Sequence, residues 1–278
     1  MAERRAAVIG HPIAHSLSPA LFAEFARAAG VDLDYQAVDV HPDALAATLA
    51  TWRDDAQFVG CNVTMPHKER IIALLEGCAD AAQATSAVNV VRRAGAGFIG
   101  DNTDVAGIAT TFSSAGFDVQ GCDAVIFGAG GGARAVATVL GDNGAAKVTI
   151  VARTVARARV LCDGASKRSP GTAFDALAMD GARPSPAQLY VNATPLGQTG
   201  QPARDLLPPN APAASLAFDL VYRPATTPFL THAAARGMKA IGGFTILLEQ
   251  ALATFEAWFG FRPQLDAAAR TRLERLAA

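Results

Sequence analysis

Short apolar runs alternate with longer segments in which apolar residues recur at helical spacing. The short runs lie at residues 6–10, 35–40, 58–63, 123–127, 147–151, 190–194 and 216–221. Helical patterns occupy residues 18–29, 42–52, 68–76, 103–115, 133–140 and 245–259. Strand–helix alternation of this kind predicts an α/β protein with parallel strands.

The strand predicted at 58–63 is followed by an uncommon set of polar residues. Asn62 and Thr64 lie at its end, Pro66 breaks it, and Lys68 lies in the turn before the next helix. Ligand-binding residues of α/β sheets collect where strands end and helices begin. A lysine at a helix start is also unfavourable to the helix dipole. We therefore predict that Lys68 handles a proton beside a bound substrate; the alternative is a solvated lysine.

Two serines mark another strand-to-helix junction. Ser18 followed by Pro19 is a strong helix start, with Ser18 as the predicted N-cap. Together with Ser16, it offers two hydroxyls near outward-pointing N–H groups, which suits a carboxylate ligand. The alternative is that Ser18 only caps its helix. His11 and His15 lie nearby, but the loop between them contains Pro12, and no metal site is expected.

Two further polar residues precede the middle of the chain. Asn89 lies in the strand-like run TSAVNVV, where asparagine is disfavoured, so a specific hydrogen bond is expected, to backbone or to ligand. Asp104 lies in GDNTDVAG at the start of a predicted helix. The local alternative is that Thr103 or Asp104 only caps that helix.

A glycine-rich turn follows the strand predicted at 123–127. The segment GAGGGA fits the G-x-G-x-x-A dinucleotide fingerprint, in which Gly128 permits the turn and Gly130 lets backbone approach a pyrophosphate. The next strand ends without an acidic residue for a ribose hydroxyl, and Arg153 and Arg157 lie close by. Because guanidinium groups pair with phosphate, the sequence predicts NADP(H) over NAD(H). The alternative for Arg157 is a solvated helix residue.

The last long helix, at 245–259, has two contrasting faces. Leu248, Leu252, Phe255 and Phe259 form an apolar stripe. The opposite face is small and uncharged, and we interpret Gln250 as its one hydrogen-bonding group, directed at a ligand. A surface glutamine is the alternative.

Composition narrows the function classes. The chain has 278 residues, enough for two modest domains, and 51% of them are hydrophobic. Its formal net charge of −1 gives no electrostatic reason to expect binding to nucleic acid or to an anionic membrane. No apolar run approaches about 20 residues, and the N-terminus does not read as a signal peptide. The four cysteines form no CxxC pair, which predicts a reducing cytoplasmic setting without zinc or disulfides.

The motifs together resemble the shikimate dehydrogenase family, in order and spacing and nearly end to end. They are GHPIAHSLSP, GCNVTMPHK, SAVN, GDNTD, GAGGGARAV, RTVARA, NATPLG, DLVYRPATTP and EQALATFEAW. The resemblance implies NADPH-dependent, reversible reduction of 3-dehydroshikimate to shikimate in aromatic amino acid biosynthesis, by a monomer or homodimer. It also implies a substrate domain at 1–104 and 238–278, a Rossmann-type NADP-binding domain at 105–237, and an active site in the cleft between them.

The same resemblance implies roles for individual residues. Lys68 and Asp104 match the catalytic pair of the family. Substrate contacts match Ser16, Ser18, Asn62, Thr64, Asn89, Tyr222 and Gln250. Cofactor contacts match Gly128, Ala129, Gly130, Gly131, Gly132, Arg153, Thr154, Arg157, Asn192, Ala193, Thr194, Leu220 and Gly243.

Several positions depart from the family pattern. Leu21 and Phe22 replace a His-Asn pair, Val90 replaces a threonine, Val105 replaces a glycine, and Ala152 replaces an asparagine. These changes leave open a paralogue acting on quinate, aminoshikimate or a related ring carboxylate. A catalytically weak NADP-binding regulator is a further alternative, although the intact Lys68–Asp104 pair argues against it.

Overall fold

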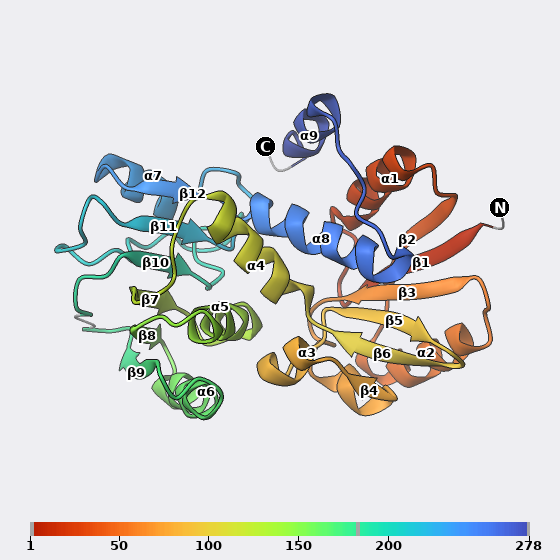
Figure 1. Ribbon diagram of the computed structural model, residues 1–278, viewed down its shortest axis with the longest axis horizontal. Coiled ribbons are helices and arrows are strands. Elements are labelled where there is room, and N and C mark those ends of the chain that lie inside the picture. Colours follow the sequence, from red (N-terminus) through yellow and green to blue (C-terminus); the bar gives the residue numbers. More distant parts are fainter. Residues whose placement is uncertain (1–2, 182–183, 277–278) are drawn as a thin grey trace. The chain divides into compact units, whose positions relative to one another are not determined.

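The computed structural model describes residues 3–181 and 184–276. It divides into two compact units, one made of the chain up to Ala106 together with Gln250–Leu276, the other of Gly107–Glu249 (Figure 1). Both are α/β, which confirms the predicted class. The predicted domain boundaries, at 104/105 and 237/238, stay a prediction of where the two functions divide.

The first unit contains a six-stranded sheet in the order β2-β1-β3-β5-β6-β4. Strands β1, β2 and β3 are parallel, but β5 is antiparallel to both β3 and β6, so the sheet is mixed rather than all parallel. A tight turn at Gly95, whose φ is +60°, lets β5 and β6 pair as a hairpin. The strands are β1 Arg4–Gly10, β2 Leu33–Asp39, β3 Phe58–Val63, β4 Gly77–Cys78, β5 Val90–Ala94 and β6 Gly97–Asp101.

Helices cover both faces of this sheet (Figure 1). On one face, aromatic rings of α1 and α8 pack together, with Phe25 edge-on to Phe255, and Phe22 stacks on Tyr35 of β2. On the other face, Leu49 and Ile71 belong to a buried core under α2 and η2. The elements are α1 Ser18–Ala29, η1 Pro42–Ala44, α2 Leu45–Arg53, η2 Arg70–Leu74, α3 Asp80–Thr85, α9 Ala267–Glu274 and α8 Phe244–Phe259, of which the residues up to Glu249 belong to the second unit.

One predicted helix is shorter and tighter than expected. The apolar spacing at 68–76 predicts an α-helix, but the structure has the 3-10 helix η2 at Arg70–Leu74. Leu75 is already extended, and the Glu76 N–H donates to the Phe98 carbonyl of β6 at 3.0 Å. Tertiary pairing with the sheet therefore ends the helix early.

The second unit contains a parallel sheet in the order β12-β11-β10-β7-β8-β9, as the sequence predicts. Its strands are β7 Asp123–Phe127, β8 Lys147–Ala152, β9 Ala173–Ala178, β10 Leu189–Asn192, β11 Leu216–Asp219 and β12 Lys239–Ile241. Its helices are α5 Gly131–Asp142, α6 Val155–Arg168 and α7 Pro228–Ala235, while α4 Thr103–Ser114 begins in the first unit. The core on the α7 side includes Tyr190 and Phe229.

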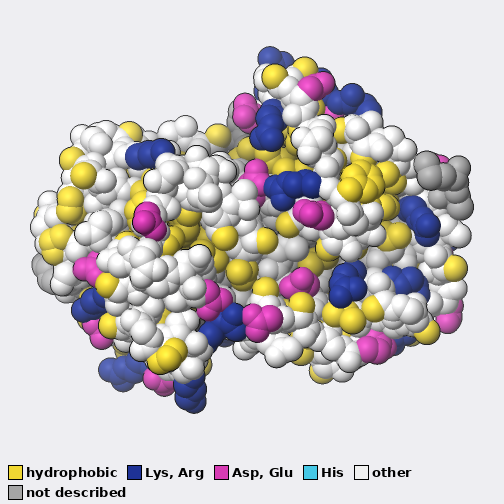
Figure 2. Space-filling model, in the orientation of Figure 1, with side chains coloured by type: hydrophobic (Ala, Val, Ile, Leu, Met, Phe, Trp, Pro, Cys, Tyr) yellow, Lys and Arg dark blue, Asp and Glu magenta, His cyan; other side chains and the backbone are white. Residues whose placement is uncertain are grey.

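The charged side chains and the cysteines are distributed over both units. Figure 2 shows basic and acidic side chains interspersed over the visible face of the molecule. None of the helices in the described parts of the chain is long and apolar enough to cross a membrane. Cys61, Cys122 and Cys162 are buried thiols, and Cys78 is half-buried.

Candidate functional site

The structure brings the two predicted catalytic residues together. Lys68 Nζ lies 2.7 Å from Asp104 Oδ2, and both side chains are partly buried. The turn that carries Lys68 is fixed on both sides, because the Val88 N–H donates to the Lys68 carbonyl at 2.8 Å and the buried His67 ring lies 2.8 Å from the Val40 carbonyl. Burial lowers the pKa of His67, so this imidazole is neutral near pH 7. The sequence offered no signal for this role of His67.

The start of α4 is capped by a residue that the sequence analysis did not name. Asn102 precedes the helix, and its Oδ1 accepts the Asp104 N–H at 3.1 Å. The local alternative, in which Thr103 or Asp104 is the cap, is therefore wrong. Since Asn102 makes the capping bond, the Asp104 carboxylate is left for other partners.

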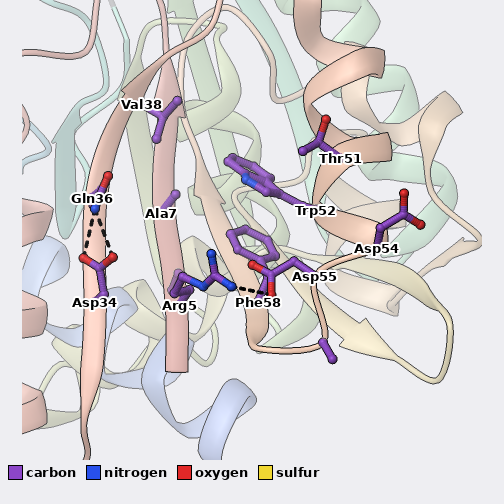
Figure 3. Close-up of a pocket in the computed structure, with 12 residues that line it drawn as sticks. Arg5, Ala7, Asp34, Gln36, Val38, Thr51, Trp52, Asp54, Asp55 and Phe58 are labelled. Atoms are coloured by element: carbon purple, nitrogen blue, oxygen red, sulfur yellow. Dashed lines mark hydrogen bonds and ion pairs between the residues drawn. The ribbon is translucent and has the colours of Figure 1, made fainter. Parts of the chain in front are cut away.

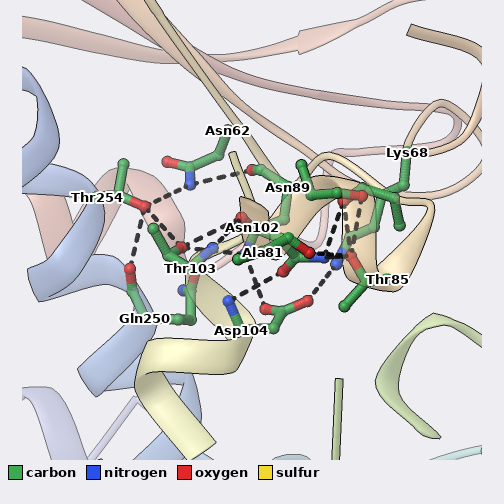
Figure 4. Close-up of polar contacts among 12 residues, drawn as sticks. Asn62, Lys68, Ala81, Thr85, Asn89, Asn102, Thr103, Asp104, Gln250 and Thr254 are labelled. Carbon is green, nitrogen blue, oxygen red and sulfur yellow. Dashed lines mark hydrogen bonds and ion pairs between the residues drawn. The ribbon is translucent and has the colours of Figure 1, made fainter. Parts of the chain in front are cut away.

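Asn89 finds its hydrogen bonds within the protein. It lies just before β5, is 3% exposed, and its Nδ2 donates to Asp104 Oδ1 at 2.8 Å. Its Oδ1 accepts the Thr103 N–H at 2.7 Å. One amide thus orients the Asp104 carboxylate whose other oxygen meets Lys68 (Figure 4).

Asn62 is similarly enclosed. Its Oδ1 accepts the Tyr35 hydroxyl at 2.9 Å, and its Nδ2 donates to Thr254 Oγ1 at 3.2 Å. Burial raises the pKa of Tyr35, which keeps the phenol protonated as a donor. Neither Tyr35 nor Thr254 was predicted, because both reach Asn62 from distant parts of the sequence.

The serine junction differs in detail from the prediction. Leu17 is the N-cap of α1 and Ser18 is its first residue, so the prediction of Ser18 as N-cap is wrong. Instead, the Ser18 N–H donates to Ser16 Oγ at 3.2 Å. Ser16 follows β1, and Thr64 follows β3, its N–H donating to the Ile9 carbonyl of β1 at 2.9 Å. The three hydroxyl residues therefore follow neighbouring parallel strands at their carboxyl ends.

Gln250 lies on α8 of the first unit, and Tyr222 lies after β11 in the second. The Gln250 carbonyl accepts the Thr254 hydroxyl at 3.0 Å. The interpretation of Gln250 as the one hydrogen-bonding group of its helix face is wrong, because Thr254 on the same face also bonds to Asn62. Burial raises the pKa of Tyr222.

The glycine turn of the second unit is open where a nucleotide would approach. A Cβ on Gly130 or Gly131 would meet nothing within 4 Å, and Gly130 precedes α5 without any side-chain cap. Gly128 is different, because its φ is +117° and a Cβ there would lie 2.6 Å from the Ala193 carbonyl oxygen. Gly128 therefore shapes the turn, while Gly130 and Gly131 leave backbone N–H groups accessible to an anion. Ala129 and Gly132 complete the turn.

The end of β8 offers positive charge and no acid. Arg153, Thr154 and Arg157 are exposed at the start of α6, and Thr154 caps that helix without a side-chain hydrogen bond. An exposed pair of guanidinium groups beside bare helix N–H groups suits a phosphate monoester, which is what distinguishes NADP(H) from NAD(H). The predicted cofactor and the residues present are thus compatible.

The loops after β10 and β11 meet at a buried carboxylate. Asp219 is fully buried, and it accepts hydrogen bonds from Asn192 Nδ2 at 2.9 Å, the Val221 N–H at 2.9 Å and the Thr227 hydroxyl at 2.5 Å. Burial raises its pKa to about 6. Asn192 in turn accepts the Thr194 N–H at 3.1 Å. Asp219 therefore organises the predicted cofactor loop, although the sequence analysis did not single it out.

Two other predicted cofactor residues touch in the same region. A Cβ on Gly243 would lie 2.5 Å from the Leu220 carbonyl oxygen. Only glycine allows the segment before α8 to approach this backbone so closely. Gly243 thus has a packing role irrespective of any ligand.

A separate hollow of about 550 Å³ lies in the first unit, away from these residues (Figure 3). It lies beside residues 5–7 of β1 and along β2 from Asp34 to Val38, whereas the predicted substrate residues follow the strand ends. An Arg5–Asp55 ion pair of 2.8 Å crosses it. Its lining also includes Asp34, Gln36, Val38, Thr51, Trp52, Asp54 and Phe58. None of the predicted site residues lines it.

Comparison with known proteins gives the family. A family model described as the shikimate dehydrogenase substrate binding domain matches residues 8–91. The shikimate dehydrogenase (NADP(+)) of Mesorhizobium japonicum is 40% identical over 97% of this chain and 95% of its own length. The chain belongs to the shikimate dehydrogenase family.

Solved structures of shikimate dehydrogenases share the fold. The shikimate 5-dehydrogenase of Thermus thermophilus, solved in complex with NADP(H) and shikimate, is 35% identical, with a TM-score of 0.85 over 99% of this chain and 100% of that one. A 5-ketofructose reductase from a Gluconobacter strain is 27% identical, with a TM-score of 0.87 over 98% of both chains. The shikimate dehydrogenase architecture thus also occurs in a protein named for another substrate.

Proposed function

We propose that this protein catalyses the NADP-dependent, reversible reduction of 3-dehydroshikimate to shikimate. The single observation that carries the proposal is the enclosed Lys68–Asp104 pair, with Nζ and Oδ2 2.7 Å apart, in a chain of this family. Lys68 has its ammonium fixed by one carboxylate oxygen, and Asn89 fixes the other. A proton donor held in this way suits reduction of a ketone.

Lys68 donates the one proton that reduction of the ring ketone requires. NADPH, when bound, would supply a hydride to the carbon of the ring carbonyl, and the carbonyl oxygen then needs a proton. That oxygen takes a proton from the Lys68 ammonium, giving the secondary alcohol, and Asp104 keeps the lysine in place. In the reverse direction Lys68 receives the proton. Ser16 and Ser18 hold the substrate carboxylate, and Asn62, Thr64, Asn89, Tyr222 and Gln250 bind or position the ring.

The cofactor role belongs to the second unit. Backbone N–H groups of residues 128–132 hold the pyrophosphate, and Arg153, Thr154 and Arg157 hold the 2′-phosphate. Residues 192–194, Leu220 and Gly243 shape the remaining wall. The first unit then corresponds to the substrate domain and the second to the cofactor domain. The four thiols fit a reducing, cytoplasmic location, and the protein acts as a monomer or homodimer.

A second candidate is the same chemistry on quinate, aminoshikimate or another ring carboxylate. Val90 and Val105 favour it, because each replaces a residue of the family pattern next to Asn89 or Asp104. A catalytically weak NADP-binding regulator is less compatible with the intact Lys68–Asp104 pair.

Turnover of purified protein with shikimate and with quinate, each with NADP⁺ and NAD⁺, tests these proposals. We expect the highest kcat/KM with shikimate and NADP⁺. Faster turnover of quinate would move the proposal to the related ring carboxylate, and preference for NAD⁺ would overturn the cofactor assignment. Tight NADP(H) binding without turnover of any ring carboxylate would indicate the regulator.

A further inference from the structure

We propose that Thr254 is a positioning residue for the Lys68–Asp104 pair, acting through the orientation of the Asn89 amide. This inference rests on the proposed function for its catalytic consequence, but its structural basis is independent. Thr254 lies in α8 and is fully buried. Its hydroxyl oxygen is the meeting point of hydrogen bonds from three separate segments (Figure 4).

The direction of each hydrogen bond follows from the chemistry of the groups. A hydroxyl has one hydrogen to donate and two lone pairs to accept with. Thr254 Oγ1 lies 3.0 Å from the Gln250 carbonyl oxygen, which can only accept, so the Thr254 hydrogen points there. Asn62 Nδ2 at 3.2 Å and Thr103 Oγ1 at 3.1 Å must then both donate to Thr254.

This assignment fixes the next links. With its hydrogen committed to Thr254, the Thr103 hydroxyl accepts from Asn89 Nδ2 at 3.1 Å. Asn89 Oδ1 receives the Thr103 N–H at 2.7 Å, and the second Nδ2 hydrogen reaches Asp104 Oδ1 at 2.8 Å. Every link thus has a fixed donor and acceptor, and the direction reverses at Asn89 Nδ2, which donates to Thr103 on the α8 side and to Asp104 on the other.

Loss of the Thr254 hydroxyl would remove the acceptor of the Thr103 hydroxyl hydrogen. The Thr103 hydroxyl would then have Asn89 Oδ1, 3.2 Å away, as its remaining acceptor in this network. Turning toward that oxygen directs a hydrogen where the Thr103 N–H already donates. The Thr103 hydroxyl would then be oriented by Asn89 alone and no longer by α8, so the rotation of the Asn89 NH₂ group, and with it that of Asp104 beside Lys68, would be less firmly fixed.

The kinetic test compares Thr254→Val, which removes the hydroxyl at nearly constant shape, with Thr254→Ser, which keeps it. We expect Thr254→Val to lower kcat for shikimate about tenfold with an unchanged KM for NADP⁺, and Thr254→Ser to remain within about twofold of wild type. Thr111→Val is the matched control, because Thr111 is also a buried helical threonine whose hydroxyl donates to the carbonyl four residues earlier, Gly107, at 2.8 Å. Wild-type kcat in Thr254→Val, or equal losses in Thr254→Val and Thr254→Ser, would overturn the proposal.

A measurement without substrate separates this inference from the proposed function. Hydrogen exchange of the Asn89 side-chain NH₂, followed by NMR, should be slow in wild type and Thr254→Ser and about tenfold faster in Thr254→Val. Thr254→Ala serves if the valine variant does not fold. Inactive wild-type enzyme would refute the proposed function alone, whereas equal exchange in all variants would refute the positioning role alone.

Discussion

The two halves of the proposed site treat polar groups in opposite ways. In the first unit, Asn62, Asn89 and Thr254 are buried and already hydrogen-bonded to the protein. In the second, Gly130 and Gly131 are open, and the helices that start beside them and beside Arg153 lack side-chain caps. Proton transfer needs a donor fixed in advance, because small displacements cost rate. Holding a phosphate needs accessible N–H groups and positive charge, which a ligand can satisfy on arrival.

The largest expected effect comes from removing the fixed proton donor. Lys68→Ala should lower kcat by a factor on the order of 10² or more, with little change in shikimate affinity. Steady-state kinetics and calorimetric binding measure the two quantities. Lys147→Ala is a matched control, because Lys147 pairs with Asp175 at the same 2.7 Å on the surface of the second unit. Near-normal turnover in the Lys68 variant would show that the first unit does not supply a fixed proton donor, which is the main proposed contrast with the second unit.

The buried carboxyl of Asp219 shows whether the second unit also contains a polar group whose hydrogen bonds are fixed before any ligand binds. Its pKa rises from the ordinary 3.8 to about 6 because the folded protein desolvates it. The folded state therefore binds the proton more tightly, so this carboxyl stabilises the fold below pH 3.8 and loses that contribution as the pH rises through 6. Over the whole titration, from well below pH 3.8 to well above pH 6, the free energy of unfolding should fall by about 3 kcal/mol on account of this group.

The measurement is urea unfolding of wild type and Asp219→Asn at several pH values from 4 to 7. We expect the wild type to lose about 2 kcal/mol more than the variant over this range, since asparagine does not ionise. Parallel stability profiles would show that Asp219 is not the source of the pH dependence.

The variant Arg153→Asp tests whether the positive charge at the start of α6 contributes to cofactor binding. The variant should raise KM for NADP⁺ about tenfold or more and leave KM for NAD⁺ nearly unchanged, because the proposed partner of Arg153 is the 2′-phosphate, which NAD⁺ lacks. Arg159→Asp makes the same charge change on an exposed position of α6 and serves as the control. Equal losses in both variants would indicate a general electrostatic effect and not a phosphate contact.

The smallest effect separates two glycines of one turn. Gly130→Ala should fold like wild type and raise KM for NADP⁺ a few-fold, because the added methyl enters space that the protein leaves open. Gly128→Ala should instead destabilise the fold by more than about 1 kcal/mol, because its φ is +117°. Thermal melting with cofactor kinetics distinguishes them. Reversed behaviour of the pair would mean that Gly130 shapes the turn.

Local sequence signals found much of the fold. The strands predicted at 58–63 and 123–127 have those bounds in the structure, since each is an apolar run with a glycine or proline after it. The glycine turn before α5 was equally predictable from the sequence, because its whole pattern lies within a few residues. The family resemblance, now confirmed, likewise depended on short motifs in a fixed order.

The hydrogen-bond network around Asn62, Asn89 and Asp104 could not be predicted from local sequence patterns. Thr103 and Thr254 bond across 151 positions, and Tyr35 reaches Asn62 from another strand. The same limitation explains the misplaced cap of α4, because Asn102, Thr103 and Asp104 are adjacent and all of residue types that cap helices. Only the packed structure decides which oxygen faces the helix N–H groups.

The distribution of the thiols has a practical consequence for chemical labelling. Burial raises the pKa of Cys61 strongly and those of Cys122 and Cys162 to about 11, so their reactive thiolate forms are scarce near neutral pH. The Cys78 thiol, whose pKa burial also raises, is the half-buried one in the short strand β4. A brief treatment with maleimide should therefore place a single fluorophore on the first unit of the unmodified protein. Such a label would mark the first unit without any change to the amino-acid sequence.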